Sequence, residues 1–327
     1  MKAFVMRSYG SPVQLALADV PQPVPAEDEV LVRVRATSVN PYDWHHLRGE
    51  PIVARLMGGM NPRHPKYAVL GADVAGQVEA VGAAVTAFQP GDAVYALLEQ
   101  GGFGEYVCVP ESGLTPMPKN LSFEEAAAVP LAGCTALLAV RDDGRLQPGQ
   151  KVLVNGASGG VGTFAVQIAK ALGASVTGVC GPRNTGLVRS IGADQVIDYS
   201  TQDFTAAGPE YDLVIDIAGS RSAAACRRVL KRDGTYAVVG GKAGRWVQPV
   251  GHMFGMLAVA PFASQRMTGV DLVRCKENMR NLATLTGLIE AGKVKPVIDR
   301  SYPFAEIPAA VTYQEGGHAA GKVVVTY

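Results

Sequence analysis

The sequence has few cysteines and no closely spaced pair of them. Its five cysteines are spread along 327 residues, and none forms a C-x-x-C pair. This spacing argues against a disulfide framework and is typical of a reducing compartment such as the cytoplasm. The chain also has almost no net charge, because 30 Lys and Arg residues and 29 Asp and Glu residues sum to +1. No nucleic-acid partner is therefore expected.

Long apolar runs and a secretory signal are missing as well. The longest apolar stretch, near residues 253–263, is interrupted by Gly255 and Pro261 and is too short to cross a bilayer. The first residues, MKAFVMRSYG, contain no apolar core of the kind that a signal peptide has. We therefore expect a cytoplasmic protein with no membrane partner, and the length predicts two domains.

What the sequence does contain is a glycine-rich turn between a strand and a helix. Residues 152–154 are an apolar run typical of a buried strand, and residues 155–162 read NGASGGVG. Apolar residues then recur at helical spacing, Gly173 ends the helix, and a second strand follows at residues 176–179. Strand, turn, helix and strand form the unit that binds a dinucleotide, with the pyrophosphate at the start of the helix. The residues expected to contact it are Ser158, Gly159, Gly160, Val161 and Gly162.

The residues of this glycine-rich turn permit a second interpretation. Gly156–Gly160 also matches G-x-S-x-G, the nucleophile turn of hydrolases. That interpretation gives Gly162 no role, and the downstream histidines, His252 and His318, have no obvious acidic partner in the sequence. The dinucleotide interpretation is favoured, although Ala157 stands where the first glycine of G-x-G-x-x-G is expected.

The rest of the chain predicts an all-β region, a doubly wound α/β region and a β-rich tail. Ser122 and Glu125 have the spacing of a capping box, which begins the first helix. The α/β region should form a doubly wound parallel sheet, and the tail should re-enter the first domain. The expected strands are 2–6, 29–36, 76–82, 93–97, 104–110, 195–199, 212–216, 235–239 and 322–326, and the expected helices are 133–140, 184–190, 222–230 and 276–291.

Several stretches carry a family resemblance through their order and spacing. They are Val39–Asp43, Leu70–Gly76, Gly91–Val94, Pro130–Ala136, Gly156–Gly162, Leu172–Ala174, Gly192–Tyr199 and Gly321–Val325. Together they resemble the medium-chain dehydrogenase/reductase superfamily, and within it the zinc-independent quinone oxidoreductases. The resemblance implies a GroES-like catalytic domain of residues 1–122 and 290–327 and a Rossmann domain of residues 123–289. It also implies a homodimer in which a strand near residues 266–274 pairs with its copy.

No metal site is expected. Zinc-dependent relatives carry a cysteine where this chain has Asn40 and a His-Glu pair where it has Ala72 and Asp73, and residues 96–106 contain no cysteine. Zinc needs three or four ligands with suitable spacing. Cys134 and His64 are therefore interpreted as packing and surface residues.

The cofactor is expected to be NADPH rather than NADH. An NAD site has an acidic residue after the second strand, whereas this chain has Cys180, and Arg183 follows it as a donor for a 2′-phosphate. Gly316, Gly321 and Lys322 have the spacing of a triphosphate-binding loop, but Val323 and a following strand argue against that function. The other residues expected at the cofactor are Thr135, Asn184, Tyr199, Gly240 and Lys322.

The reaction implied by the resemblance is hydride transfer from NADPH to a quinone or an α,β-unsaturated carbonyl compound. Asn40 and His45 are the expected catalytic residues, with His45 or water as the source of the proton. Asn40 could instead only form a turn before Pro41. Two alternatives stay open, a dehydrogenase or reductase of simple alcohols or aldehydes, and a non-catalytic NADPH-binding sensor or partner-binding protein.

Overall fold

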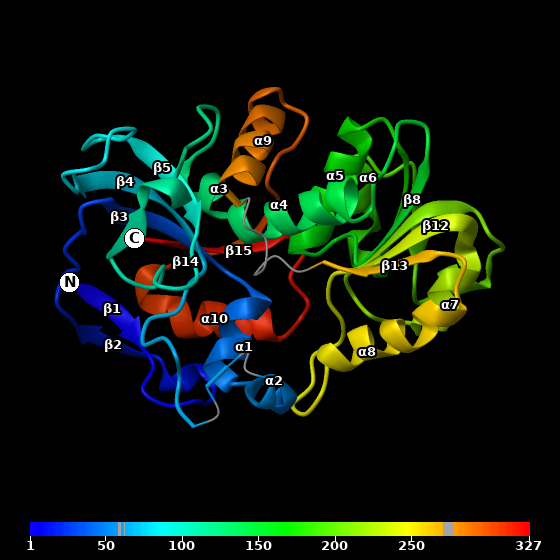
Figure 1. Cartoon of the computed structure of the whole chain (residues 1–327), viewed down its shortest axis with the longest axis horizontal. Coiled ribbons are helices and arrows are strands. Elements are labelled where there is room, and N and C mark those ends of the chain that lie inside the picture. The colour runs from blue at the N-terminus through cyan, green and yellow to red at the C-terminus, as the bar shows by residue number, and fades with distance from the viewer. Residues whose placement is uncertain (58–59, 62, 271–277) are drawn as a thin grey trace.

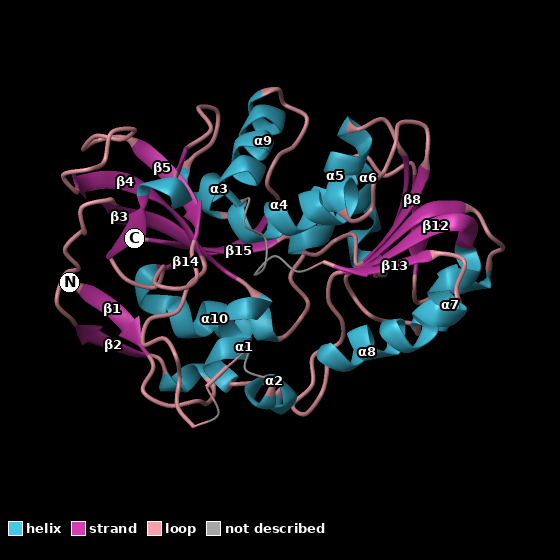
Figure 2. Cartoon of the chain, in the orientation of Figure 1, coloured by secondary structure: helices cyan, strands magenta, loops and turns pink. Residues whose placement is uncertain are grey.

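Two β-sheets lie side by side with helices around them (Figure 1). The computed structural model describes the chain except for residues 58–59, 62 and 271–277. The N-terminus and the C-terminal strand belong to the same half of the molecule, which is the left half in Figures 1 and 2. The tail therefore re-enters the first half, as the sequence predicts.

The first sheet has seven strands and is mostly antiparallel. In spatial order it contains β14 (Ile298–Pro303), β15 (Lys322–Thr326), β3 (Glu29–Val39), β4 (Asp73–Val81), β5 (Ala93–Leu97) and β7 (Thr115–Pro116), and β6 (Tyr106–Pro110) pairs with β3. A separate hairpin pairs β1 (Lys2–Val5) with β2 (Ala16–Asp19). β15 pairs with β3 from Val39 to Ala36, so the end of the chain lies beside the residues that lead into Asn40.

The second sheet has six strands, all parallel. Its order is β10 (Gln195–Asp198), β9 (Ser175–Cys180), β8 (Lys151–Asn155), β11 (Tyr211–Asp216), β12 (Leu230–Val238) and β13 (Arg266–Gly269). This is the strand order of a Rossmann fold, and the direction of winding changes between β8 and β11. Ligands of such sheets bind at the carboxyl ends of the strands beside that point, where the glycine turn lies.

Helices cover both sheets (Figure 2). They are α1 (Pro41–Arg48), α2 (Ile52–Leu56), α3 (Phe123–Ala127), α4 (Pro130–Leu137), α5 (Gly160–Ala171), α6 (Thr185–Ser190), α7 (Ala223–Cys226), α8 (Val250–Val259), α9 (Asn278–Glu290) and α10 (Ile307–Glu315). The capping box of α3 is present, because Ser122 and Glu125 exchange hydrogen bonds of 3.3 and 3.0 Å. None of the helices in the described part of the chain is long and apolar enough to span a bilayer.

The largest core runs from one sheet to the other. It includes Tyr95 of the first sheet, Leu285 of α9 and Phe164 of α5, each fully buried. Burying side chains of this size contributes about 1.5–3 kcal/mol each. Tyr95 also donates a hydrogen bond of 2.9 Å to the carbonyl of Leu282. The two halves are therefore packed together along α4 and α9, and the site between them is held by this junction.

Some expected elements differ from the structure. The first region is not all-β, because α1 and α2 follow β3, and the tail contains α10 besides its strands. The helix expected at 222–230 consists of α7, which ends at Cys226, and a 3₁₀ helix at Arg227–Val229, and β12 begins at Leu230 to pair with β11. The helix expected at 133–140 begins at Pro130, where proline fits the first turn. Parts of the strand expected at 266–274 and of the helix expected at 276–291 lie outside the described residues. The domain boundaries near residues 122 and 290 stay a prediction.

Candidate active site

The glycine turn holds α5 directly against the strand before it. A Cβ atom on Gly162 would lie 2.1 Å from the carbonyl oxygen of Gly156, so only glycine fits there. Gly159 is the N-cap of α5 in an extended conformation, and no side chain caps the helix. Gly162 therefore allows α5 to pack closely on the turn that follows β8.

The first turn of α5 offers unpaired donors to a ligand. Gly160, Val161 and Gly162 are its first three residues, and the first N–H with a partner inside the helix is that of Thr163, 2.9 Å from the carbonyl of Gly159. A Cβ on Gly159 would meet nothing nearer than 3.6 Å, which leaves the turn open. These residues fit a pyrophosphate, since N–H groups at a helix start favour anions.

The residues expected at the 2′-phosphate lie in the loop after β9. Arg183 is exposed, and the described residues give its guanidinium no carboxylate partner. Tyr199 is 59% exposed, and its hydroxyl lies 3.0 Å from where a Cβ on Gly181 would be. Asn184 donates to the Ser158 hydroxyl at 3.2 Å and so ties this loop to the glycine turn. The contacts of Arg183, Asn184 and Tyr199 with a cofactor phosphate stay predictions.

The serine of the hydrolase motif does not contact a histidine among the described residues. Ser158 accepts from Asn184 instead. His252 does have an acidic partner, contrary to the expectation from the sequence, because its Nε2 lies 2.9 Å from Asp216 Oδ2. Asp216 is the last residue of β11 and His252 lies in α8, so only the tertiary structure brings these two residues together.

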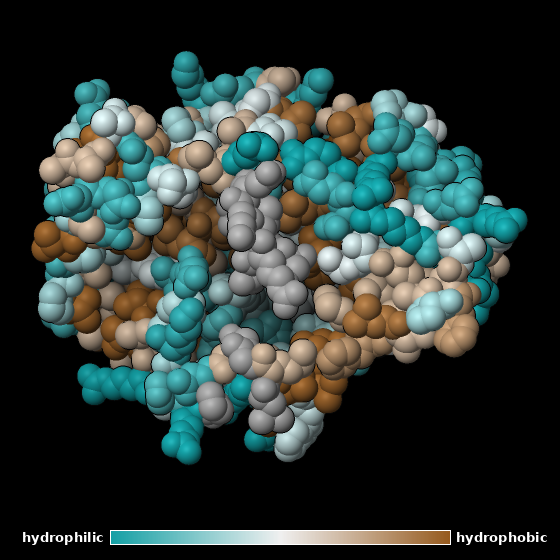
Figure 3. Space-filling view, viewed as in Figure 1, coloured by the Kyte–Doolittle hydropathy of each residue, from teal (hydrophilic) through white to brown (hydrophobic). Residues whose placement is uncertain are grey.

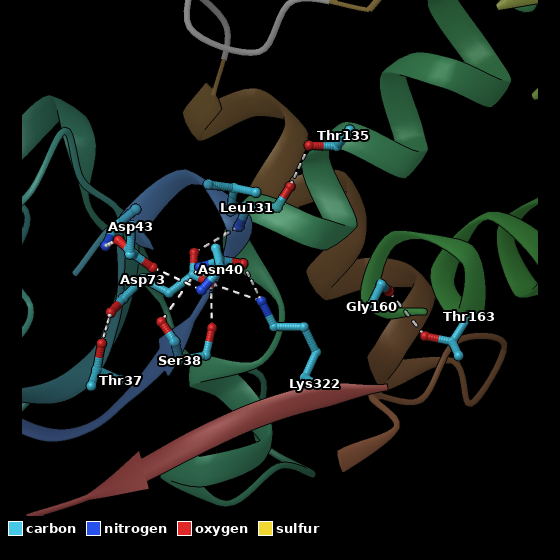
Figure 4. Close-up of polar contacts among 11 residues, drawn as sticks. Thr37, Ser38, Asn40, Asp43, Asp73, Leu131, Thr135, Gly160, Thr163 and Lys322 are labelled. Carbon is cyan, nitrogen blue, oxygen red and sulfur yellow. Dashed lines mark hydrogen bonds and ion pairs between the residues drawn. The ribbon is translucent and has the colours of Figure 1, made fainter. Parts of the chain in front are cut away.

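A buried network of polar side chains lies beside the glycine turn (Figure 4). Asp73 is fully buried, and Lys322 is 3% exposed. Asp73 Oδ2 accepts hydrogen bonds from the Asn40 amide at 2.9 Å and from Lys322 Nζ at 3.2 Å, and the Ser38 hydroxyl donates to the same oxygen. Its other oxygen accepts from the backbone N–H of Leu131 at 2.8 Å, in the first turn of α4, where a carboxylate is favoured. One carboxylate therefore joins β3, β4, β15 and α4.

Asn40 is engaged at both ends of its amide. Its oxygen accepts from Lys322 Nζ, and its nitrogen donates to Asp73. The backbone N–H of Asn40 donates to the Asp43 carboxylate at 2.7 Å, which makes Asp43 a cap of α1. Burial raises the pKa of the Asp43 carboxyl to about 7, although this backbone N–H opposes the rise. These hydrogen bonds hold Asn40 and the side chains around it in fixed positions. A contact between Asn40 and a substrate stays a prediction.

Lys322 bridges the network and the glycine turn. A Cβ on Gly160 would lie 3.0 Å from the Lys322 side chain, while its ammonium reaches Asn40 and Asp73. The sequence interpretation did not include Asp73 in the site. The sequence did contain a signal for this ion pair. Asp73 and Lys322 are charged residues in otherwise apolar strands, and a charge that is buried there needs a partner.

The residues in this network do not fit zinc. Asn40, Ala72 and Lys322 provide no thiolate, imidazole or carboxylate, and the ammonium of Lys322 would repel a metal ion at Asp73. In the described part of the chain no group of three or more His, Cys, Asp and Glu side chains could hold a metal.

Thr135 lies in α4, and Gly240 lies just after the end of β12. The Thr135 hydroxyl donates to the Leu131 carbonyl at 2.7 Å, which leaves its oxygen free to accept (Figure 4). Gly240 has no room for a side chain, since a Cβ would lie 3.0 Å from the carbonyl of Ile217. Their contacts with the cofactor stay predictions.

His45 is a poor source of a proton. Its Nδ1 lies 2.9 Å from the carbonyl oxygen of Glu50, and its ring stacks on Trp44 with 3.8 Å between centroids. A carbonyl only accepts, so Nδ1 carries the proton and the neutral Nε2 has none to give. Burial lowers the pKa of His45 from 6.5 to about 4. This arrangement favours water as the proton donor.

The replacement His45→Phe should therefore change kcat less than about threefold between pH 5.5 and 8, whereas loss of a general acid costs about 100-fold or more. Because the pKa of His45 is depressed on folding, the stability it supports is present above pH 6.5 and lost as the pH falls towards 4. The measurements are kcat–pH profiles and urea titrations of both proteins. A large loss of kcat at neutral pH would restore His45 as the acid.

Comparisons with known proteins agree with this geometry. Residues 26–119 match the family of alcohol dehydrogenase GroES-like domains, and residues 191–325 match the zinc-binding dehydrogenase family. The chain is 34% identical to the chloroplast envelope quinone oxidoreductase homolog of Arabidopsis thaliana, over 99% of this chain and 98% of that protein. It is also 34% identical to the chloroplastic NADPH-dependent alkenal/one oxidoreductase of Arabidopsis thaliana, over 99% of this chain and 79% of the relative.

A solved structure shows the same fold along the entire chain. The quinone oxidoreductase from Coxiella burnetii superposes with a TM-score of 0.86, at 29% identity, and covers 100% of this chain and 99% of its own. The two chains therefore share one fold along their whole length.

Proposed function

Since this chain belongs to the medium-chain dehydrogenase/reductase superfamily and resembles quinone oxidoreductases over its whole length, we propose that it reduces quinones or α,β-unsaturated carbonyl compounds with NADPH. NADPH supplies the hydride when bound. The observation that carries the proposal is the open first turn of α5 beside a buried network that contains donors but no metal-ligand set. Such a site suits an acceptor that needs hydrogen bonds rather than a Lewis acid.

In this proposal the residues of the chain bind, orient and exclude water. The N–H groups of Gly160, Val161 and Gly162 hold the pyrophosphate, and Arg183 holds the 2′-phosphate. Lys322 uses two of its three N–H groups on Asn40 and Asp73, and this leaves one for a ligand near the turn. The positive charge of Lys322, which Asn40 holds in place, stabilises the negative charge that develops on the acceptor's oxygen, and water supplies the proton.

A panel of acceptors tests the reaction. Purified protein should oxidise NADPH in the presence of 1,4-naphthoquinone or 3-buten-2-one, above the rate measured without enzyme. Of two NADPH samples deuterated at opposite faces of C4, one should transfer its label to the β-carbon of the product of 3-buten-2-one and the other should not. Turnover of simple aldehydes or alcohols, with neither a quinone nor an enone reduced, would overturn the proposal.

The proposed reaction needs no zinc. Lys322 forms an ion pair of 3.2 Å with Asp73, and its ammonium would repel a metal ion there. Metal analysis of the purified protein should therefore find zinc well below one equivalent, and chelation should leave activity unchanged. Stoichiometric zinc that leaves together with the activity would show that another set of ligands exists.

A homodimer is the assembly that we propose. β13 pairs only with β12 among the described strands, so none of them pairs with its outer edge, and α8 beside it exposes Phe254 (45%) and Leu257 (54%). Figure 3 shows apolar side chains along this part of the surface. An open strand edge next to an apolar helix suits pairing with a second copy.

The cytoplasmic location stays a prediction.

Leu257→Asp should therefore shift the protein from dimer to monomer in light scattering after size exclusion, because a charge would be buried in the interface. Val13→Asp is the matched control, since Val13 is exposed far from α8. A wild-type protein that is monomeric at micromolar concentration would contradict the dimer.

A further inference from the structure

Residues 242–249 reach from the Rossmann sheet to α2 on the other side of the molecule. The N–H of Ile52 donates to the carbonyl of Arg245 at 2.9 Å, and the N–H of Val53 donates to that of Trp246 at 3.0 Å. Ile52 and Val53 begin α2, so their N–H groups have no partner within that helix. The segment 242–249 therefore supplies acceptors that the first turn of α2 lacks.

Both ends of this segment are tied to one buried carboxylate. Asp216 is fully buried, and its Oδ2 accepts from the Tyr236 hydroxyl at 2.6 Å and from His252 at 2.9 Å. Tyr236 lies in β12, just before the segment, and His252 lies in α8, just after it. The other oxygen of Asp216 accepts from Asn155 at 2.7 Å, at the end of the strand that leads into the glycine turn. The segment is therefore coupled to the cofactor turn through Asp216.

The segment closes the side of the site that the junction of the sheets leaves open. In Figure 1, α4 and α9 lie along the upper rim between the two halves, whereas α2 and the start of α8 meet at the lower rim. Figure 3 shows a recess in the surface between the two halves, above the lower rim. On its other side α2 is held by Arg55, which donates to the carbonyls of Gly49 and Arg48 at 2.6 and 3.0 Å.

We propose that residues 242–249 are a strap that closes the active-site recess by holding α2, and that its release sets how fast NADPH leaves. The strap opens when the two hydrogen bonds to α2 break, while Asp216 keeps its ends in place. The inference concerns the site of the proposed function, but its cofactor readouts require only NADPH binding and no acceptor.

A pair of substitutions at Ile52 isolates the hydrogen bond. Ile52→Pro removes the N–H, and proline fits because this residue opens the helix and Pro51 has ψ 151°, which a following proline requires. Ile52→Ala shortens the side chain and keeps the N–H. In a chase with excess NADP⁺, NADPH fluorescence should report dissociation about fivefold faster from Ile52→Pro than from Ile52→Ala, the factor expected for one net hydrogen bond. Equal rates in the two variants would overturn the strap.

Hydrogen exchange tests the same contact in the unmodified chain. The amides of Ile52 and Val53 should exchange more slowly when NADPH is bound, because cofactor binding favours the closed strap. Exchange that is the same with and without NADPH would refute the coupling. If both strap effects are observed but neither quinones nor enones are reduced, the proposed function is wrong and the strap is kept.

Discussion

Asp73→Asn is expected to lower the free energy of unfolding by about 3–5 kcal/mol, because it leaves a buried cation without its partner. Lys322 is 3% exposed and has Asp73 as its ion-pair partner at 3.2 Å. Three donors also converge on Asp73 Oδ2, from Ser38, Asn40 and Lys322. Asparagine can place an oxygen towards only one side, so at least one donor would face an NH₂ group. Urea unfolding followed by circular dichroism measures the change.

Two control variants distinguish the cost of a buried unpaired charge from the cost of losing an exposed ion pair. Asp19→Asn removes an exposed partner of Lys2 and should cost less than about 1 kcal/mol. The double variant Asp73→Asn/Lys322→Met removes the cation as well and should recover much of the loss, because no charge remains buried alone. A cost for Asp73→Asn below about 1 kcal/mol would mean that water reaches Lys322 and that the network is not closed. Turnover should stay low in the double variant, since the ordered cation is gone.

Arg183→Glu is expected to weaken NADPH binding by about 100-fold and to leave NADH binding unchanged or slightly stronger. The substitution removes a charged hydrogen bond worth about 1.5–3 kcal/mol and adds repulsion against the 2′-phosphate. Arg183 is exposed in the loop after β9, and Cys180 stands where an acidic residue would favour NADH. Fluorescence titrations with both cofactors measure the two dissociation constants.

Arg189→Glu is the matched control, because Arg189 is also exposed and the change in net charge is the same. It should alter both cofactor affinities only slightly. If Arg183→Glu weakens NADPH and NADH equally, Arg183 has a structural role in the loop and the 2′-phosphate is held elsewhere. Raising the salt concentration should reduce the NADPH preference of the wild type, since exposed charges are screened.

Features that depend on neighbouring residues could be predicted from the sequence. The glycine turn, the start of α5 and the capping box of Ser122 and Glu125 depend on local hydrogen bonds and sterics, and each is present. α10 was missed although its signal is local too. Pro308 lies in its first turn, and the buried Ile307, Ala310 and Val311 have helical spacing. The helix expected at 222–230 changes from α-helix to a 3₁₀ helix at Arg227–Val229 and ends there, because Leu230 pairs with Tyr211 of β11.

The sequence alone determined the cofactor turn, because backbone N–H groups at a helix start and the space that glycine leaves are properties of a few adjacent residues. Only the tertiary structure decided what faces that turn. Asn40 and Lys322 are 282 positions apart, and the pairing of β15 with β3 brings them together. His252 meets Asp216, and α2 meets Arg245, in the same way. Buried charges and unpaired backbone groups require partners, but the sequence does not state which distant residue provides them, since only packing of the two sheets sets those distances.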